Sequence, residues 1–427
     1  MNLKRLTKLM LLLVSVLVLS SCSGSDAKPE KKMVEVSFWH VFSENFGAPV
    51  IKEMVAAFND SQSEINVTEV YNPDMYPGLM QNLQAEVAAG EAPSIAMIGY
   101  NYINYFADNF EFVDPETLVE NQVPEDKRYL EETFLPNILS LGQVDGKQIG
   151  LPYAISTPIL YYNADLFKQA GLEPKAPVTW QEVRELAQII QQKTGNFGFY
   201  MQEYADNWAI QGLLESNGAR ILTDGKASFA SKEAIQAYEL LADMVQNKSA
   251  LHMGADEGIQ AFSNGKVGML LGTSAKIGTI QRAVEFELKG GTFPVFAGKE
   301  RRIPAGGNFL PIMAKEPEEQ KAAWQFIKFM MEPEWLAKWS ENTGYLPPRE
   351  EVATDPEGLK GYIEENELFG IAFKEMAEIH SWVAFPDDVG AQAEQLFANT
   401  RDQILDGTVS VEKALKQAED EINGWLK

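Results

Sequence analysis

Cysteine is almost absent from this chain of 427 residues, since Cys22 is the only one. A disulfide within the chain, a zinc site built from several thiolates and a Cys-x-x-Cys redox pair are therefore excluded. Histidine is nearly as rare, and His40, His252 and His380 are too few for a histidine-rich metal centre. We expect the protein to work without a bound metal or cofactor.

Positive charge is also scarce. The chain has 36 Lys and Arg against 61 Asp and Glu, which gives a formal net charge of -25. Such an acidic protein repels nucleic-acid phosphates and an anionic bilayer surface, so neither is an expected partner. Hydrophobic residues nevertheless make up 45% of the chain and aromatic residues 11%. That supply is enough for two or three packed domains of roughly 150 residues each.

Several catalytic motifs are missing. The segment Gly265-Lys266-Val267 lacks the upstream glycine and the Ser or Thr of a phosphate-binding loop, and neither G-x-S-x-G nor H-E-x-x-H occurs. Kinase-like and zinc-protease functions are therefore excluded. Among so many acidic residues some pair always has the spacing of glycosidase carboxylates, so a secreted glycosidase stays open as an alternative.

The N-terminal segment indicates export. Three basic residues and no acid lie within residues 1–8, and an apolar run over residues 9–19 follows, as in a secretory signal. The run is shorter than the roughly 20 residues that span a bilayer. It ends in Leu19-Ser20-Ser21-Cys22, which resembles the lipobox of bacterial lipoproteins, where the cysteine thiol receives diacylglycerol.

We therefore predict a lipoprotein signal peptide over residues 1–21 and a lipidated, flexible tether over residues 22–32, beginning at Cys22. The alternative is an ordinary cleavable signal followed by a chance cysteine. Lipidation places the protein in the cell envelope, anchored on the periplasmic or extracytoplasmic face of the membrane.

Short apolar runs alternate with helical patterns along the rest of the chain, which is typical of an α/β fold. The pattern predicts strands over residues 34–38, 65–70 and 94–99 and helices over residues 51–58 and 79–89. This β-α-β-α-β order requires a parallel sheet. Thr179 with Glu182 predicts a helix cap, Asp145-Gly146 and Asp224-Gly225 predict hairpin turns, and residues 317–427 are mainly helical.

Four segments carry a resemblance to a known family. They are Phe38-Trp39-His40; residues 156–163 with Leu166-Phe167, Ala170-Gly171-Leu172, Pro177 and Thr179-Trp180; Phe262, Gly265, Lys266 and Met269; and Gly306-Gly307 with residues 343–347. Their order and spacing resemble those of the extracellular solute-binding proteins of bacterial ABC importers, in the sugar-binding class (family 1). Within that class the chain resembles the glycerol-3-phosphate and glycerophosphodiester-binding branch most.

The resemblance implies a bilobal periplasmic-binding-protein fold, with two α/β lobes, a hinge and a helical C-terminal region. Lobe 1 is expected to comprise residues 33–155 plus 292–345, and lobe 2 residues 156–291 plus 346–427. The expected function is capture of a carbohydrate in the interlobe cleft and delivery to the transmembrane subunits of an ABC permease. The resemblance implies no catalytic residue and therefore no enzyme, and we expect a monomer.

Residue-by-residue comparison with the family implies a set of ligand contacts. These are Tyr76, Ser156, Ser274, Gly307 and Tyr345. Four aromatic residues near the cleft complete the set, namely Trp39, Tyr100, Trp208 and Trp382. Each has an alternative structural role: loop packing for the first tyrosine, turns or caps for the serines, a tight backbone for the glycine and core packing for the aromatic rings. His40 is a further candidate, with the same alternative of an interior residue.

Two departures from the glycerol-phosphate branch bear on the ligand. Tyr100 stands where that branch has an acidic residue, and Trp382, in the sequence His-Ser-Trp-Val-Ala-Phe-Pro, stands near the place of its phosphate-pairing arginine. A buried phosphate without a cation is costly, so we prefer a neutral sugar or oligosaccharide. Arg301 and Arg302 could hold an anion, but a solvated loop is the favoured interpretation. Glycerol-3-phosphate or a glycerophosphodiester remains an alternative ligand, and a surface adhesin or sensor an alternative role.

Overall fold

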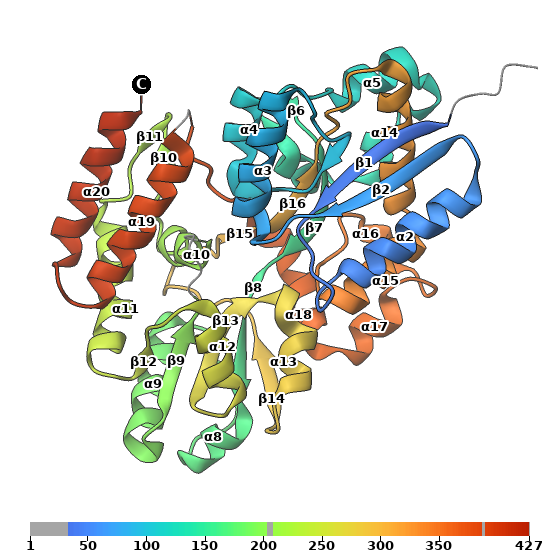
Figure 1. Cartoon of the computed structure of the whole chain (residues 1–427). Helices are drawn as coiled ribbons and strands as arrows, with labels where there is room; N and C mark the ends of the chain where they lie inside the picture. The colour runs from blue at the N-terminus through green and yellow to red at the C-terminus, as the bar shows by residue number, and fades with distance from the viewer. Residues whose placement is uncertain (1–32, 203–207, 387–388, 427) are drawn as a thin grey trace, which may run out of the picture. The chain divides into compact units, whose positions relative to one another are not determined.

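The computed structural model describes residues 33–202, 208–386 and 389–426. The predicted signal peptide, Cys22 and the tether lie outside these residues. The described chain forms two α/β lobes, each around its own sheets (Figure 1). Within the described residues, no helix combines the length and the apolar character that crossing a membrane requires.

The first lobe begins with a parallel sheet in the strand order β2-β1-β3. Its strands are β1 (Val34–His40), β2 (Ile65–Tyr71) and β3 (Ile95–Ala96), and its connecting helices are α2 (Ala48–Ser61) and α3 (Met75–Ala89). The predicted β-α-β-α-β order is confirmed. The single strand expected over residues 94–99 is wrong, because the chain leaves β1 after Met97, whose N–H still bonds to the Trp39 carbonyl, and joins another sheet as β4 (Ile98–Gly99).

That other sheet is antiparallel, in the order β4-β16-β7. Its longer strands are β7 (Leu151–Ser156) and β16 (Gly306–Leu310). The two lie so close that a Cβ built on Gly307 would stand 1.9 Å from the carbonyl oxygen of Ala154. Gly307 also has a φ of 117°, in the region that only glycine adopts readily. The backbone geometry therefore requires glycine at this position.

The second lobe has a five-stranded sheet. In spatial order its strands are β12 (Ala250–Leu251), β9 (Phe197–Met201), β13 (Val267–Thr273), β8 (Pro158–Asn163) and β14 (Leu288–Gly291). Helix α9 (Trp180–Thr194) packs on β9 and begins at the predicted capping box of Thr179 and Glu182. Both predicted Asp-Gly hairpins are also confirmed, by β5 (Gln143–Val144) with β6 (Lys147–Gln148) and by β10 (Leu222–Thr223) with β11 (Lys226–Ala227).

Helices cover the sheets of both lobes. On the first lobe these include α4 (Ile103–Asn109), α5 (Pro115–Gln122), α6 (Tyr129–Thr133), α7 (Pro136–Leu139), α14 (Pro317–Met330) and α15 (Pro333–Thr343). The second lobe carries α8 (Ala164–Gln169), α10 (Trp208–Ser216), α11 (Lys232–Gln246), α12 (Ala255–Ser263), α13 (Ile277–Ala283) and α18 (Glu367–Glu375). Between α15 and α18 run α16 (Glu350–Thr354) and α17 (Lys360–Glu365). The last helices, α19 (Gly390–Leu405) and α20 (Val411–Trp425), pack on α11 (Figure 1).

The chain passes between the two lobes through short segments. Thr157 joins β7 of the first lobe to β8 of the second. Residues 292–305 lead from β14 back to β16 and include β15 (Ile303–Pro304), which pairs in parallel with β17 (Ile379–His380). The exact lobe boundaries given above stay a prediction.

A buried carboxyl group lies beside the second of these passages. Glu375 is 1% exposed, and its Oε1 accepts the N–H of Phe293 at 2.7 Å. Burial raises the pKa of Glu375 to about 8, although Arg301 opposes the rise. Arg301 itself is mostly buried and pairs with Glu378 at 2.9 Å, so the expected solvated loop is wrong for this residue. The buried acid and the arginine together hold the passage between the lobes.

We expect Gly307→Ala to lower the free energy of unfolding by about 2–4 kcal/mol, because the new Cβ overlaps a backbone carbonyl that cannot move aside. Denaturant unfolding measures the loss. Gly298→Ala is the matched control, since Gly298 also has a positive φ, of 73°, but no atom within 4 Å of its Cβ position. The control should lose only about 1 kcal/mol. Equal losses in the two variants would show that β16 and β7 do not need this close approach.

We expect Glu375→Gln to reduce the pH dependence of stability. Because folding raises this pKa, the stabilisation by the neutral carboxyl is fully present below pH 4.5, the ordinary pKa. It is lost as the pH rises toward about 8. The variant, which cannot ionise, should melt about 2–4 °C above wild type near pH 8 and converge with it near pH 4. Thermal unfolding across this window gives the comparison, with the exposed Glu365→Gln as control. A constant difference between wild type and Glu375→Gln at all pH values would contradict the expectation.

Candidate functional site

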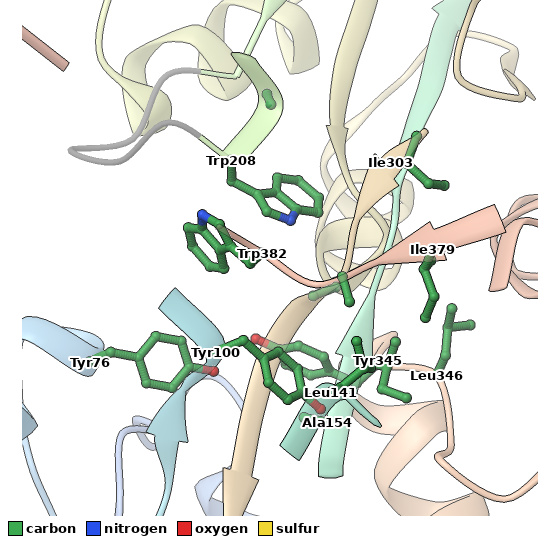
Figure 2. Close-up of a cluster of buried hydrophobic side chains, with 14 of the residues drawn as sticks. Tyr76, Tyr100, Leu141, Ala154, Trp208, Ile303, Tyr345, Leu346, Ile379 and Trp382 are labelled. Carbon is green, nitrogen blue, oxygen red and sulfur yellow. The ribbon is translucent and has the colours of Figure 1, made fainter. Parts of the chain in front are cut away.

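Five buried aromatic side chains from distant parts of the chain come together between the lobes, and we name them the aromatic cluster. They are Tyr76, Tyr100, Trp208, Tyr345 and Trp382 (Figure 2). Tyr76 and Tyr100 come from the first lobe, at the start of α3 and in the 3-10 helix after β4, and Trp208 opens α10 of the second lobe. All five belong to the set predicted from the family resemblance. Their role as ligand contacts stays a prediction.

The hydroxyl group of Tyr76 lies in a neutral polar network. It accepts a hydrogen bond from Nδ2 of Asn308 at 3.1 Å and is also hydrogen-bonded to the side chain of Tyr345. Burial raises the pKa of Tyr76 to about 12, so the hydroxyl keeps its proton at neutral pH. The Oδ1 of Asn308, which is fully buried, has no hydrogen-bond partner among the described residues. Unsatisfied acceptors and hydroxyl donors of this kind suit a ligand that carries hydroxyl groups.

Tyr100 adds a second unsatisfied group. Its ring stacks on Phe309, with centroids 6.3 Å apart and an interplanar angle of 23°. Burial raises the pKa of Tyr100 well above its ordinary value, and a weak interaction with the backbone of Tyr153 opposes the rise. By distance and angle, however, the Tyr100 hydroxyl makes no well-formed hydrogen bond in the described part of the chain. A buried hydroxyl without a partner costs about 1–3 kcal/mol, which a ligand oxygen can recover.

The two tryptophans lie against each other on the other side of the cluster (Figure 2). Their ring centroids are 6.4 Å apart, and Nε1 of Trp208 donates to the carbonyl of Pro304 at 3.1 Å. Gly306 leaves room for both Ser156 and Trp208, because a Cβ there would stand 2.5 Å from Ser156 Oγ and 3.1 Å from the indole. The structure therefore places Ser156, another predicted contact, next to Trp208.

Two predicted ligand contacts, Ser274 and Gly307, have structural roles that involve the backbone. The Oγ of Ser274 accepts the N–H of Thr157 at 3.2 Å, while the Ser274 N–H donates to the Thr157 carbonyl at 2.9 Å. Ser274 thus braces the passage from β7 to β8. Gly307 makes the close approach described above. Contact with a ligand stays a prediction for both.

Within the described residues, no ring pair joins Trp39 or His40 to the aromatic cluster. Trp39 is half-buried on β1, and among the described residues its ring contacts none of the cluster rings. His40 is fully buried, with Nε2 at 2.7 Å from Glu69 Oε2 and Nδ1 accepting the N–H of Phe42 at 3.2 Å. Burial lowers the pKa of His40, although Glu69 opposes this. With both ring nitrogens occupied, His40 is a satisfied interior histidine.

A cavity of about 180 Å³ adjoins the cluster. Its lining consists of Tyr100, Ile103, Asn104, Leu141, Gln143, Leu222, Ser381, Trp382, Val383 and Ala384, none of which is charged. The volume is below the roughly 300–1,000 Å³ of typical small-molecule pockets, so a ligand of several rings needs the lobes to move apart. Nowhere in the described ranges do three or more His, Cys, Asp or Glu side chains gather as possible metal ligands.

Three amide side chains near the cluster were not predicted from the sequence. Asn308 bonds to Tyr76, Asn104 donates to the carbonyl of Ala384 at 2.7 Å, and Gln211 bonds to the backbone beside Trp382. No motif or spacing in the sequence marks them, because their partners are brought near only by the tertiary fold.

Comparison with known proteins gives a family match over residues 53–368, to a model described as bacterial extracellular solute-binding protein. Among curated proteins, the sn-glycerol-3-phosphate-binding periplasmic protein UgpB of Yersinia pseudotuberculosis is 26% identical over 362 residues, covering 81% of this chain and 80% of its own. The Escherichia coli protein of the same name is 26% identical over 359 residues, covering 80% of each chain.

Solved structures have the same fold. The cyclic alpha-maltosyl-1,6-maltose binding protein of Arthrobacter globiformis aligns with a TM-score of 0.80 at 25% identity, covering 93% of this chain and 100% of its own. UgpB of Mycobacterium tuberculosis, solved with glycerophosphocholine, aligns with a TM-score of 0.79 at 20% identity, covering 92% and 98%. These similar proteins include binders of a neutral oligosaccharide and of a phosphate-containing compound.

Proposed function

Because the chain belongs to the family of bacterial extracellular solute-binding proteins, we propose that it captures a neutral sugar or oligosaccharide between its lobes and delivers it to the permease of an ABC importer. Binding and delivery break no bond, and the protein is not an enzyme. The secreted glycosidase considered from composition alone is therefore set aside.

The observation that carries the neutral ligand is the character of the cavity. None of the lining residues that the structure describes is charged, although the chain as a whole has 61 acidic and 36 basic residues. Trp382 contributes a flat apolar surface, and Tyr100 contributes a hydroxyl without a partner. Sugars present apolar C–H faces and hydroxyl groups, which match rings and neutral hydrogen-bonding groups. A phosphate or carboxylate would enter this space without a cation to pair with.

The arginines next to the second passage support the same choice. The guanidinium of Arg301 donates hydrogen bonds to Glu378, the Phe293 carbonyl and Thr292. Arg302 is half-buried, with Nε at 3.9 Å from Glu215, and neither arginine lines the cavity. Both are directed toward acidic residues of the protein itself.

Glycerol-3-phosphate or a glycerophosphodiester is the alternative ligand, supported by the names of the similar UgpB proteins and by one lysine. Nζ of Lys276 lies 4.8 Å from the centroid of the Phe46 ring, which in turn lies 6.2 Å from that of Tyr345. Burial lowers the pKa of Lys276, so its charge is already partly desolvated. This lysine is the cation that we would assign to a phosphate group.

The protein acts outside the cytoplasm, as its family does. We further propose that Cys22 carries the lipid anchor and that the mature protein works as a monomer, since closure of two lobes of one chain needs no second subunit. The proposed contacts are the aromatic cluster with Ser156, supported by their proximity; Ser274, Gly307 and Trp39 are retained on the resemblance alone.

We expect a thermal-shift panel on protein beginning at Asp26 to show stabilisation by a neutral mono- or oligosaccharide and none by glycerol-3-phosphate or glycerophosphodiesters. A cognate ligand at about 100 times its Kd adds roughly 2.7 kcal/mol to stability. Trp382→Ala should abolish the shift, while Trp425→Ala, at the end of α20 and far from the cavity lining, should keep it. A shift with phosphate compounds alone would overturn the neutral assignment and direct attention to Lys276.

The lipid anchor is tested with the full chain in a bacterial host. We expect wild type to fractionate with membranes and Cys22→Ser to associate with them less, because the variant lacks the thiol that accepts the proposed lipid. Metabolic labelling with a fatty acid should mark wild type alone. Equal membrane association of both proteins, with no label on either, would refute lipidation at this cysteine.

A further inference from the structure

Helix α10 carries, one turn after Trp208, an amide that is bonded entirely within the protein. Gln211 is 2% exposed. Its Nε2 donates to the carbonyl of Ser381 at 3.1 Å, and its Oε1 accepts the N–H of Val383 at 2.9 Å. A longer contact, of 3.4 Å, joins Nε2 to Glu215 on the same helix. Both ends of the amide thus bond to the backbone immediately before and after Trp382.

These two bonds reproduce the pattern of a parallel β bridge, in which one residue bonds to the carbonyl of residue i and the N–H of residue i+2 of its neighbour. The bonded segment follows directly after β17, whose own parallel partner is β15. In such a ladder the residue between the two bonded groups points out of the pairing plane. Gln211 therefore fixes the direction of the Trp382 side chain.

The other lobe holds the same segment one residue further on. Asn104 of α4 donates from Nδ2 to the carbonyl of Ala384 at 2.7 Å. Trp382 is consequently fixed by bonds from both sides and presents its ring to the cavity beside Trp208.

An amide of this length satisfies both backbone groups. A glutamate would keep an acceptor for Val383 but lose the donor to Ser381, and it would place a second carboxyl next to the buried Glu215. A leucine has similar volume but loses both bonds. The two bonds to the backbone therefore depend on the amide group of Gln211 and not only on the size of its side chain.

We propose that Gln211 is a positioning residue for ligand specificity, which sets the orientation of Trp382 against the apolar face of the ligand. The part of this inference that concerns ligand binding rests on the proposed function, whereas the part that concerns the orientation of Trp382 does not.

The ligand arm is a double-mutant cycle, read by calorimetric titration with the sugar that gives the largest thermal shift. Gln211→Leu should weaken binding about tenfold, and it should add little to Trp382→Ala, because both changes remove the same contact. Gln62→Leu is the matched control: Gln62 also bonds through both amide ends to the backbone, at Ile65, but on the far end of α2. It should lower the melting temperature without changing affinity. Multiplicative losses in the Gln211→Leu, Trp382→Ala double variant would overturn the inference.

A second arm needs no ligand. The near-UV circular dichroism difference between wild type and Trp382→Phe gives the contribution of Trp382, which includes its interaction with Trp208. Gln211→Leu should change that contribution. If the Gln211→Leu variant does not fold, Gln211→Glu is used in its place. An unchanged contribution in the folded variants would overturn the inference. A changed contribution in a protein that binds no sugar would support the positioning role and refute the proposed function separately.

Discussion

The close approach of β16 to β7 is the constraint on which the site depends. Gly307 lets the two backbones touch, and Gly306 leaves space for Ser156 and the indole of Trp208. The same strand then carries Asn308 to the hydroxyl of Tyr76. A larger side chain at either glycine would separate strands that hold groups from both lobes. The two longer strands of this sheet thus adjoin both passages between the lobes and carry residues that contact the aromatic cluster.

Local structure was predictable because local chemistry determines it. The capping box of Thr179 and Glu182 bonds within one turn, and each Asp-Gly pair supplies the positive φ values of a tight hairpin. Hydrophobic spacing located β1 to β3 and their helices. The strand expected over residues 94–99 failed because its second half changes partner, from β1 to β16, which is more than 200 residues later in the chain.

The site was predictable only in part. Resemblance to the family supplied the five aromatic residues, because each lies in or near a segment whose order and spacing match those of the family. No sequence pattern marks the amides of Asn104, Gln211 and Asn308. The role of a side-chain amide can be recognised only when its hydrogen-bond partner is known. The arginine at 301 was misjudged for the same reason: its neighbours in sequence are charged, but its partner is Glu378.

The segment that bears Trp382 is bonded to Gln211 of one lobe and Asn104 of the other. A ligand that fits the cavity as it stands and stacks on this tryptophan would stabilise the conformation in which both bonds exist, and the two events would share one coupling free energy. Such coupling is reciprocal. Movement of the lobes apart would break the bond to Asn104 and lower the affinity for such a ligand by the same factor.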